Sequence, residues 1–374
     1  MKDRVKIFMF SDALGYEIVQ RYRFMTDEFP VRLPVRTQFG YSSTCVPTIL
    51  TGEPPTKHGH FSFFYRPKDA ETPFNLFRFL HPFLHPSVIF DNHRIRHRVS
   101  MWLARRLKFT GYFNLYRVPY ARLPFFDYCE KQDIFAPHGL APVKNLRDML
   151  TESGVPFHIS NWHLNDDQNI AVAKKLLEEE KTEFFFIYTA GLDSMLHFHV
   201  HEPEVVAKHL EAFSDKVRSV LETAHAHFRQ VDFCIFSDHG MTPLKGETDI
   251  KAMIEALPLK FGRDYIAAYD STMLRVWFLK PEARRPVMDA VRTRPVTGSP
   301  RRRRPRSTSI SPTARTATRS SCSTRASSWS RATWGTNPSP ACTDSRPTTG
   351  IPRRASFPSA SCRSIRARSP TSSA

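Results

Sequence analysis

The chain has 374 residues, 41 % of them hydrophobic, so it is long enough to bury one large core or two ordinary ones. Its formal net charge of +18 suggests a polyanionic partner, but residues 291–374 hold 17 Arg, one Asp and neither Lys nor Glu. That stretch contributes +16 and leaves +2 for residues 1–290. The body of the chain is therefore nearly neutral, which excludes a strongly basic core.

Cysteine usage and hydropathy favour a reducing, soluble setting. None of the six cysteines forms a C-x-x-C pair, and their spacing does not resemble a disulfide framework. No apolar stretch reaches the ~18 residues that a membrane span needs, and "MKDRVKIFMFSD" runs directly into a strand-like segment rather than a signal peptide. We expect a cytoplasmic protein.

Apolar runs along the chain predict a parallel sheet. Residues 5–12, 183–193 and 231–240 each have the composition of a buried strand, and helical patterns cover 170–181 and 205–228. Alternating strands and helices predict an α/β fold, a three-layer α/β/α arrangement with a mostly parallel central sheet.

The predicted strands share a polar ending. Asp12, Asp193 and Asp238 stand where the three strands end. Ligands of such sheets bind beyond the carboxyl ends of the strands, so we expect these aspartates to lie close together. A single aspartate in such a place is more often a turn residue or a helix cap.

Residues 66–150 differ from the rest because they are crowded with Phe, Tyr, His and Arg. We interpret them as an insertion that caps the site within a core of residues 1–290. A basic amphipathic surface for lipid is the alternative for "HRIRHRVSMWLARRLKF". We expect the cap to pack on the core, so membrane contact is not the favoured interpretation.

Carboxylates and imidazoles recur at metal-ligand spacing. Asp193 and His197 are four residues apart, hence on one face of a helical turn, and Asp238 is followed by His239. With Asp12 they form a ligand set for zinc or a similar ion. Two such clusters suggest two divalent ions roughly 4 Å apart, as in phosphoryl-transfer sites. The histidines at 199 and 201 are expected on the surface.

A nucleophile candidate lies in "GYSSTCVPTILTGEPPTKHGH", residues 40–60. We predict a helix over 46–51, preceded by the hydroxyls of Ser42, Ser43 and Thr44. A helix N-terminus stabilises an alkoxide through its free N–H groups, and a metal ion could complete the activation. A plain N-cap role is the alternative.

The segments "FSDALG", "TILTGEPPTKHG", "LDSMLH" and "SDHGM" resemble motifs of the alkaline phosphatase superfamily, and most closely its type I phosphodiesterase and nucleotide pyrophosphatase branch. The resemblance implies two zinc ions and a Ser or Thr nucleophile. It assigns Asp12, Asp238 and His239 to one ion, and Asp193 and His197 to the other.

The resemblance also indicates the nucleophile. In the family it stands nine residues before the Thr of T-G, which is Ser42 here. The family's T-x-P signature would instead fall on Cys45-Val46-Pro47, so Ser43 and Thr44 remain candidates. Nucleotide pyrophosphatases have an Asn where this chain has Phe63, which counts against a nucleotide pyrophosphate substrate.

The family needs a further histidine in a C-terminal G-x-H-G segment, and the tail has none in frame. Read one frame later, residues 315–326 can encode an alternating strand pattern. In the same frame, residues 331–335 can encode S-Y-M-G, and residues 340–345 can encode G-M-H-G-F. We infer a frameshift near residues 290–300, which makes 291–374 a disordered remnant of the core.

The leading hypothesis is a two-metal hydrolase of phosphate esters, a phosphodiesterase that acts on a small-molecule substrate through a phospho-enzyme. A phosphomonoesterase, phosphotransferase or sulfatase of the same superfamily is the runner-up, although Ile49 stands where a sulfatase has Arg. A non-enzymatic RNA-binding protein with a basic tail is the third hypothesis. We expect no specific nucleic-acid partner.

Overall fold

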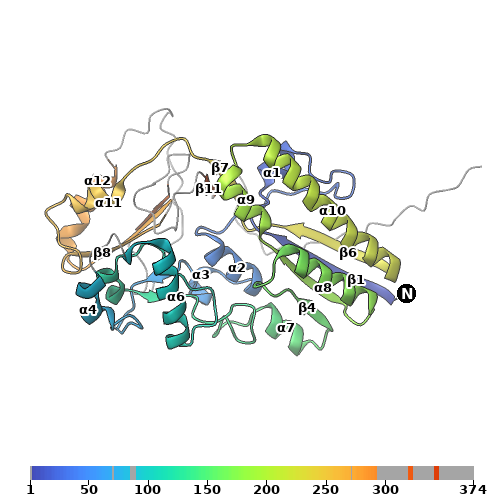
Figure 1. The fold of residues 1–374 in the computed structure, drawn as a ribbon, viewed down its shortest axis with the longest axis horizontal. Helices are drawn as coiled ribbons and strands as arrows, with labels where there is room; N and C mark the ends of the chain where they lie inside the picture. The colour runs from blue at the N-terminus through green and yellow to red at the C-terminus, as the bar shows by residue number, and fades with distance from the viewer. Residues whose placement is uncertain are drawn as a thin grey trace, which may run out of the picture. The chain divides into compact units, whose positions relative to one another are not determined.

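The computed structural model describes residues 2–69, 71–84, 90–270 and 272–292, with the backbone of 319–322 and 341–344. The described chain forms two compact units, shown in Figure 1. The first unit contains the chain up to Gly52, Ala141–Thr242 and the chain from Thr343; the second contains Glu53–Leu140 and Pro243–Cys342. The division into a core, a cap at 66–150 and a tail remains a prediction, and most of the tail lies outside the described residues.

A four-stranded parallel sheet forms the centre of the first unit. Its order is β4-β5-β1-β6, with β4 at Phe157–Ile159, β5 at Phe184–Thr189, β1 at Lys2–Ser11 and β6 at Phe228–Phe236. Side chains of β1 are fully buried at successive inward positions, including Val5, Ile7 and Met9. A strand covered on both faces must be apolar almost throughout, which explains the apolar runs of the sequence.

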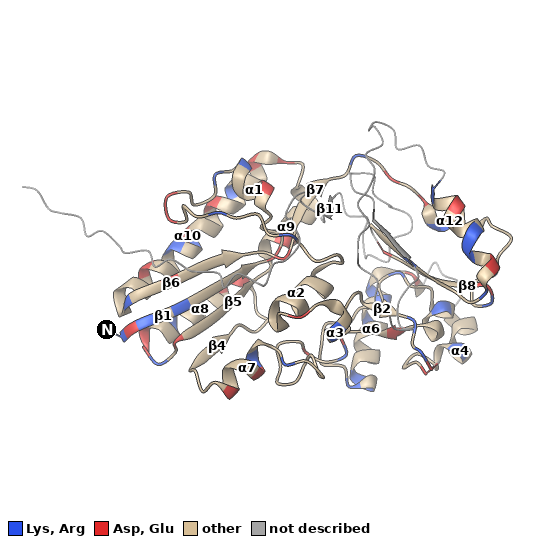
Figure 2. Cartoon of the chain, turned by 180° about the vertical axis from the view of Figure 1, so that it is seen from behind, with Lys and Arg blue, Asp and Glu red and all other residues tan. Residues whose placement is uncertain are grey.

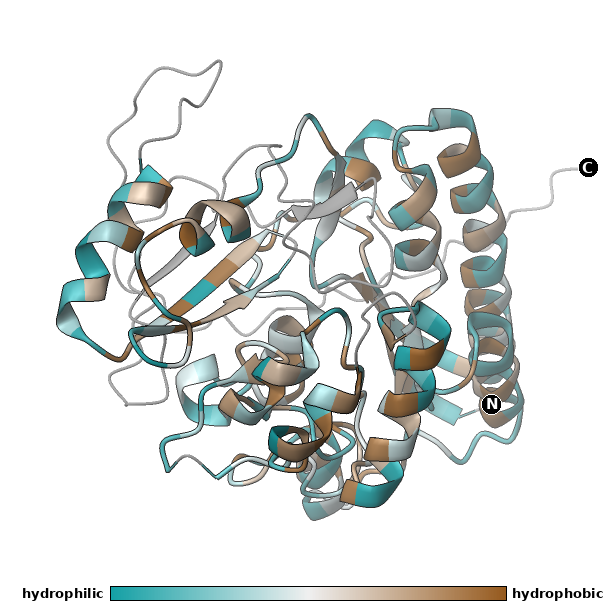
Figure 3. Cartoon of the chain, turned by 60° about the vertical axis from the view of Figure 1, so that its left-hand side comes forward, coloured by the Kyte–Doolittle hydropathy of each residue, from teal (hydrophilic) through white to brown (hydrophobic). Residues whose placement is uncertain are grey.

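Helices connect and cover these strands. The bounds in the first unit are α1 Tyr16–Arg21, α2 Ser42–Thr51, α7 Leu146–Glu152, α8 Asp166–Glu178, α9 Gly191–His199 and α10 Pro203–His227. Helix α8 packs on β5, α10 packs on β6, and the two helices contact each other. Brown and teal residues recur in turn along α10, the long helix at the right of Figure 3, as an amphipathic helix requires.

The predicted fold class is confirmed, since helices flank a central parallel sheet. The strand predicted at 5–12 and both long helices lie close to where the sequence placed them, whereas the strand predicted at 231–240 begins earlier, at Phe228, and ends at Phe236. The strand predicted over 183–193 is wrong at its end, because β5 stops at Thr189 and α9 begins at Gly191. The helix predicted from Val46 begins four residues earlier, at Ser42.

The second unit has an aromatic core with two antiparallel sheets. One sheet pairs β2 (Phe64–Tyr65) with β3 (Asp127–Tyr128), and the other has the order β10-β9-β8. Around them the buried Phe74, Phe126 and Tyr128 pack in one cluster. The remaining bounds are α3 Pro55–His58, α4 Phe77–Leu80, η1 His81–Leu84, α6 His93–Leu107, η2 Tyr120–Phe125, α11 Ile250–Glu255, β8 Tyr265–Tyr269, β9 Met273–Phe278, η3 Pro281–Ala283, α12 Arg284–Arg292 and β10 Arg319–Cys322.

A short two-stranded sheet pairs β7 (Gly240–Pro243) with β11 (Ala341–Asp344). Across the described ranges, none of the helices has the length and apolar character to cross a lipid bilayer.

Candidate active site

Asp12 follows the last residue of β1. Its backbone N–H donates to the carbonyl of Thr189, 2.9 Å away, which fixes the chain as it leaves the sheet. The next residue, Ala13, adopts a left-handed backbone with φ 63°, so the chain turns sharply after the aspartate. The Asp12 side chain is thereby held in a buried position at the carboxyl end of β1.

Asp238 and His239 come two and three residues after β6 ends, and both are buried. The Oδ1 atom of Asp238 accepts from the His239 backbone N–H at 2.9 Å and from that of Ala13 at 3.5 Å. Its Oδ2 atom is buried and has no hydrogen-bond partner among the described residues. A buried carboxylate oxygen without a donor calls for a cation.

Asp193 and His197 both lie on α9, where Asp193 occupies the first helical turn. The prediction that Asp193 ends a strand is wrong, because this residue lies inside α9. The spacing of four residues puts both side chains on one face, with His197 Nε2 3.4 Å from Asp193 Oδ2. This contact raises the pKa of His197 through the hydrogen bond to the carboxylate.

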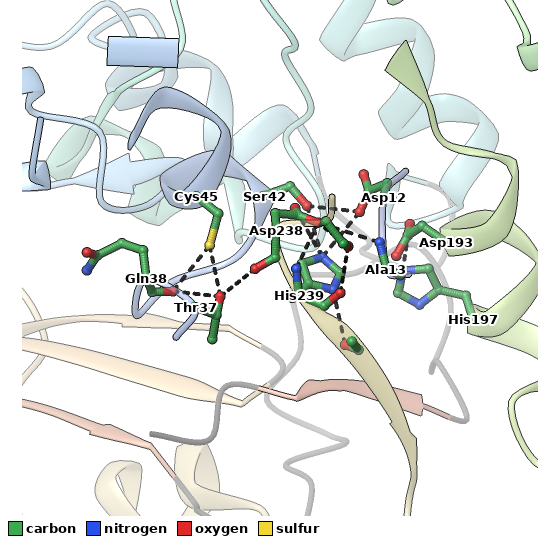
Figure 4. Close-up of polar contacts among 12 residues, drawn as sticks. Asp12, Ala13, Thr37, Gln38, Ser42, Cys45, Asp193, His197, Asp238 and His239 are labelled. Atoms are coloured by element: carbon green, nitrogen blue, oxygen red, sulfur yellow. Dashed lines mark hydrogen bonds and ion pairs between the residues drawn. The ribbon is translucent and has the colours of Figure 1, made fainter. Parts of the chain in front are cut away.

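Ser42 is the first residue of α2, and its hydroxyl faces two of the predicted ligands. The Ser42 Oγ atom lies 3.0 Å from His239 Nε2 and 3.5 Å from Asp12 Oδ1. Figure 4 shows the three side chains pointing toward one another. Ser43 Oγ and Thr44 Oγ1 are instead buried without a hydrogen-bond partner in the described chain. Of the three hydroxyl candidates, Ser42 contacts the acidic cluster.

Asp12, Asp193 and His239 each offer a ligand atom within 4.8 Å of the other two. Burial, and then the nearby charges of Asp238 and Asp193, raise the pKa of Asp12 well above its ordinary value. Carboxylates gathered in a buried place repel one another unless a cation neutralises them. The donor set of two carboxylates and one imidazole suits zinc or a similar divalent ion.

Two of the five predicted ligands are outside this three-atom group. Asp238 lies next to it, since its Oδ2 is 3.5 Å from His239 Nε2. His197 contacts Asp193, which is a member of the group. The C-terminal histidine that the resemblance calls for falls in residues 340–345, whose side chains lie outside the described part of the chain.

Some residues that support the site were not predicted. The Thr37 hydroxyl donates to the Asp238 carbonyl at 2.6 Å and lies 3.3 Å from Cys45 Sγ. Gly15 and Gly240 bring two turns together, because a Cβ on Gly15 would be 2.4 Å from the Gly240 Cα. The glycines stand in "SDALG" and "SDHG", so the repeated S-D-…-G pattern was a usable signal.

A sequence profile described as "Type I phosphodiesterase / nucleotide pyrophosphatase" matches residues 40–293, more than half of the chain. The chain belongs to this family. Phosphate-ester hydrolysis of the phosphodiesterase or pyrophosphatase type is therefore its activity class. Asp12 lies before the matched range, so its place in the site depends on the structure.

A search of curated proteins finds no match. Among the solved structures that match, murine ectonucleotide pyrophosphatase / phosphodiesterase 5 superposes with a TM-score of 0.50 at 11 % sequence identity, covering 77 % of this chain and 69 % of that chain. A likeness at this identity concerns the fold alone, and it agrees with the alkaline-phosphatase-like fold class.

Proposed function

We propose that the chain hydrolyses small-molecule phosphodiesters with two divalent ions, zinc in the first instance, and with Ser42 as nucleophile. The contact that carries the proposal is the Ser42 hydroxyl, 3.0 Å from His239 Nε2 and 3.5 Å from Asp12 Oδ1. Among the hydroxyl candidates this is the one held beside possible metal ligands, at the first turn of a helix.

Asp12, Asp238 and His239 would hold one ion, and Asp193 and His197 would take part in holding the other. Bound there, the ions would lower the pKa of the serine hydroxyl and neutralise charge on the phosphoryl oxygens. The ligand sets derive from the family resemblance, and the buried Asp238 Oδ2 without a donor supports a cation at this place.

The chain's own residues orient the reaction. Asp12 and His239 hold the Ser42 oxygen, and Ser42 stands at the amino end of α2, where the helix dipole favours negative charge. The Ser42 hydroxyl gives up its proton to solvent, and its oxygen forms a bond to phosphorus as the bond to the leaving alkoxide breaks; the alkoxide takes a proton from solvent and leaves as the alcohol. Water then attacks the phosphorus, the bond to the Ser42 oxygen breaks, a phosphate monoester is released, and the serine oxygen regains a proton.

Ser42→Ala tests this proposal directly, with Ser43→Ala as the matched control. We expect Ser42→Ala to lower kcat/KM for bis(p-nitrophenyl) phosphate by roughly 10³-fold or more while the bound metal, measured by mass spectrometry, is retained. Ser43→Ala should stay within about tenfold of the parent. Loss of activity in Ser43→Ala with retention in Ser42→Ala would move the nucleophile to the next residue.

Diester specificity is tested separately with p-nitrophenyl phosphate. Faster hydrolysis of this monoester would favour the phosphomonoesterase alternative over the phosphodiesterase. Metal analysis of the same samples identifies the ions.

The C-terminal frame hypothesis has its own test. We expect the chain as given to bind its second ion weakly, and a frame-restored chain carrying G-M-H-G-F to hydrolyse the diester faster. Equal rates for the two chains would contradict the frameshift. A cytoplasmic location is also part of the proposal, in keeping with Cys45 and Cys129, which are thiols rather than disulfides in the described part of the chain.

A further inference from the structure

Helix α6, His93–Leu107, is anchored to the second unit by one face. Arg96, Ser100 and Leu103 are buried along it. The Ser100 hydroxyl accepts from the Leu115 backbone N–H at 3.1 Å, and the Arg96 guanidinium lies over the Tyr120 ring, 4.4 Å from its centroid. The helix therefore has a fixed inner face and a defined outer face.

The outer face of α6 combines cations with large apolar side chains. Met101 and Trp102 are 43 % and 49 % exposed, although both are side chains that a core normally buries. At 100° per residue, Arg94, Arg98 and Arg105 lie on the same side of the helix. Figure 2 colours the cations of α6 blue.

This charge is not neutralised locally. Residues 93–108 contain no Asp or Glu. Within the described residues, the ion pair made by this helix joins the buried Arg96 to Asp91, 2.9 Å apart, and none joins Arg94, Arg98, Arg105 or Arg106 to a carboxylate. The outer arginines are therefore available to an anionic partner.

A second exposed apolar segment neighbours α6. In α4 and η1, Phe79 is 74 % exposed and Phe83 is 77 % exposed. Phe77 of α4 stacks on Tyr120 with centroids 5.6 Å apart, and this is the same ring that Arg96 of α6 covers. Both elements thus pack around Tyr120, and each exposes aromatic side chains on its outside.

We propose that this basic-apolar surface docks the protein on a bilayer that contains anionic lipid. The surface consists of Phe79 and Phe83 of α4–η1, with Met101, Trp102, Arg94, Arg98, Arg105 and Arg106 of α6. Unpaired arginines match anionic headgroups, and Trp and Phe partition into the interfacial layer between water and acyl chains. The inference does not depend on the proposed hydrolase activity.

A nucleic acid is the weaker match for the same surface. The α4–η1 segment, "FRFLHPFL", carries a single arginine among apolar residues, whereas a single-strand groove lines the phosphate track with cations throughout. Bases could stack on Phe79 and Phe83, but Met101 has no ring to stack on, and α4–η1 offers one arginine to the phosphates. A membrane interface uses the arginines, the aromatic rings and the aliphatic Met101 together.

Co-flotation of the full chain with phosphatidylcholine vesicles, with and without phosphatidylglycerol, tests the charge. We expect binding to vesicles with the anionic lipid, and about tenfold or greater weakening in R94E/R98E/R105E. The control R21E/K175E/K208E changes the same number of exposed cations in the first unit and should bind like the parent. The Arg-rich tail is identical in all three chains, so its contribution cancels.

The apolar side chains need a second pair of variants. F79S/F83S should bind anionic vesicles at least about threefold more weakly, while V31S/L33S, altered at exposed positions of the first unit, should not. Vesicles should shift Trp emission to the blue in the parent but not in Trp102→Phe.

Equal vesicle binding by R94E/R98E/R105E and its control would overturn the proposal. So would binding of single-stranded RNA that the same triple variant loses, without any vesicle binding. Circular dichroism of each variant shows whether the fold is intact, and only variants with the spectrum of the parent are compared.

Discussion

Buried carboxylates in the parallel sheet differ in whether an arginine pairs with them. Nearer the amino ends than the site, at the middle of β6, Asp232 is buried, and Arg4 near the amino end of β1 donates to it with 2.7 Å between Nε and Oδ2. At the carboxyl ends, Asp12 and Asp238 are buried as deeply, yet no Lys or Arg of the described chain pairs with either. Figure 2 shows the blue residues at the amino end of β1.

This difference separates structural from functional charge. A buried carboxylate with an arginine partner is neutralised by the chain itself and needs nothing further. A group of carboxylates held near one imidazole has no such partner, so it keeps a proton, as the raised pKa of Asp12 indicates, or takes up a cation. The same residue type on the same strands therefore stabilises the fold at one end and prepares a binding site at the other.

Asp12→Asn should give the largest loss of activity, because it removes a proposed metal ligand and a partner of the Ser42 hydroxyl together. We expect kcat/KM for the diester to fall by roughly 10³-fold or more. Asp3→Asn, an exposed aspartate at the opposite end of β1, is the control and should keep the parent activity. Comparable activity of both variants would remove the distinction between the two ends.

Metal removal should have the next largest effect, which is a loss of folding stability. Chelation with EDTA should lower the free energy of unfolding by about 3 kcal/mol if the ion is present at 100 times its Kd beforehand. In Asp12→Asn, chelation should change the denaturation midpoint much less. A chelator effect of equal size in both proteins would show that the stabilising ion binds elsewhere.

Gly15→Ala tests how the turns beside the site are spaced. Its added Cβ would meet the Gly240 Cα at 2.4 Å, so the turns that carry Asp12 and His239 must separate. We expect a loss of about 1–3 kcal/mol in stability together with weaker metal binding. Gly246→Ala, where a Cβ meets nothing within 4 Å, should change neither.

Asp232→Asn should give the smallest effect, because Arg4 is half exposed and can be hydrated when its partner is lost. We expect about 1 kcal/mol of destabilisation in urea and an unchanged kcat/KM. A drop of activity comparable to that of Asp12→Asn would mean that the amino end of the sheet also shapes the site.

The sequence predicted the parts of the fold that depend on local pattern. Strand β1 and helices α8 and α10 are long and have a clear hydrophobic pattern, so the sequence alone predicts them. Asp12 and the Asp238-His239 pair could be assigned because they come directly after apolar strands. Their convergence then follows from the parallel arrangement of β1 and β6.

Errors occurred where distant contacts override the local pattern. Strand β5 ends early because the Asp166 carboxylate accepts from the backbone N–H groups of Ala190 and Gly191, at 2.9 and 3.1 Å. That partner is 24 residues away, so no window of sequence around Asp193 shows it.

Helix α2 was predicted too short for a different reason, which is local. Pro47 favours a helix start beside it, because proline suits the first turn. The helix begins at Ser42 instead, since the Tyr41 carbonyl accepts from Thr44 and Cys45 at 2.7 and 3.0 Å. The contact between Ser42 and His239 joins residues 197 positions apart and could not be derived from spacing.

The hydrogen bond from Thr37 to the Asp238 carbonyl has a consequence for how the enzyme could be switched off. Thr37 continues directly from a surface stretch in which Val31, Leu33 and Val35 are 75–79 % exposed. A tryptic cut after Arg36 would separate Thr37 from the chain before it and leave the five proposed metal ligands chemically unchanged. Loss of metal after this cleavage would show that residues 31–37 hold in place the turn that carries Asp238 and His239.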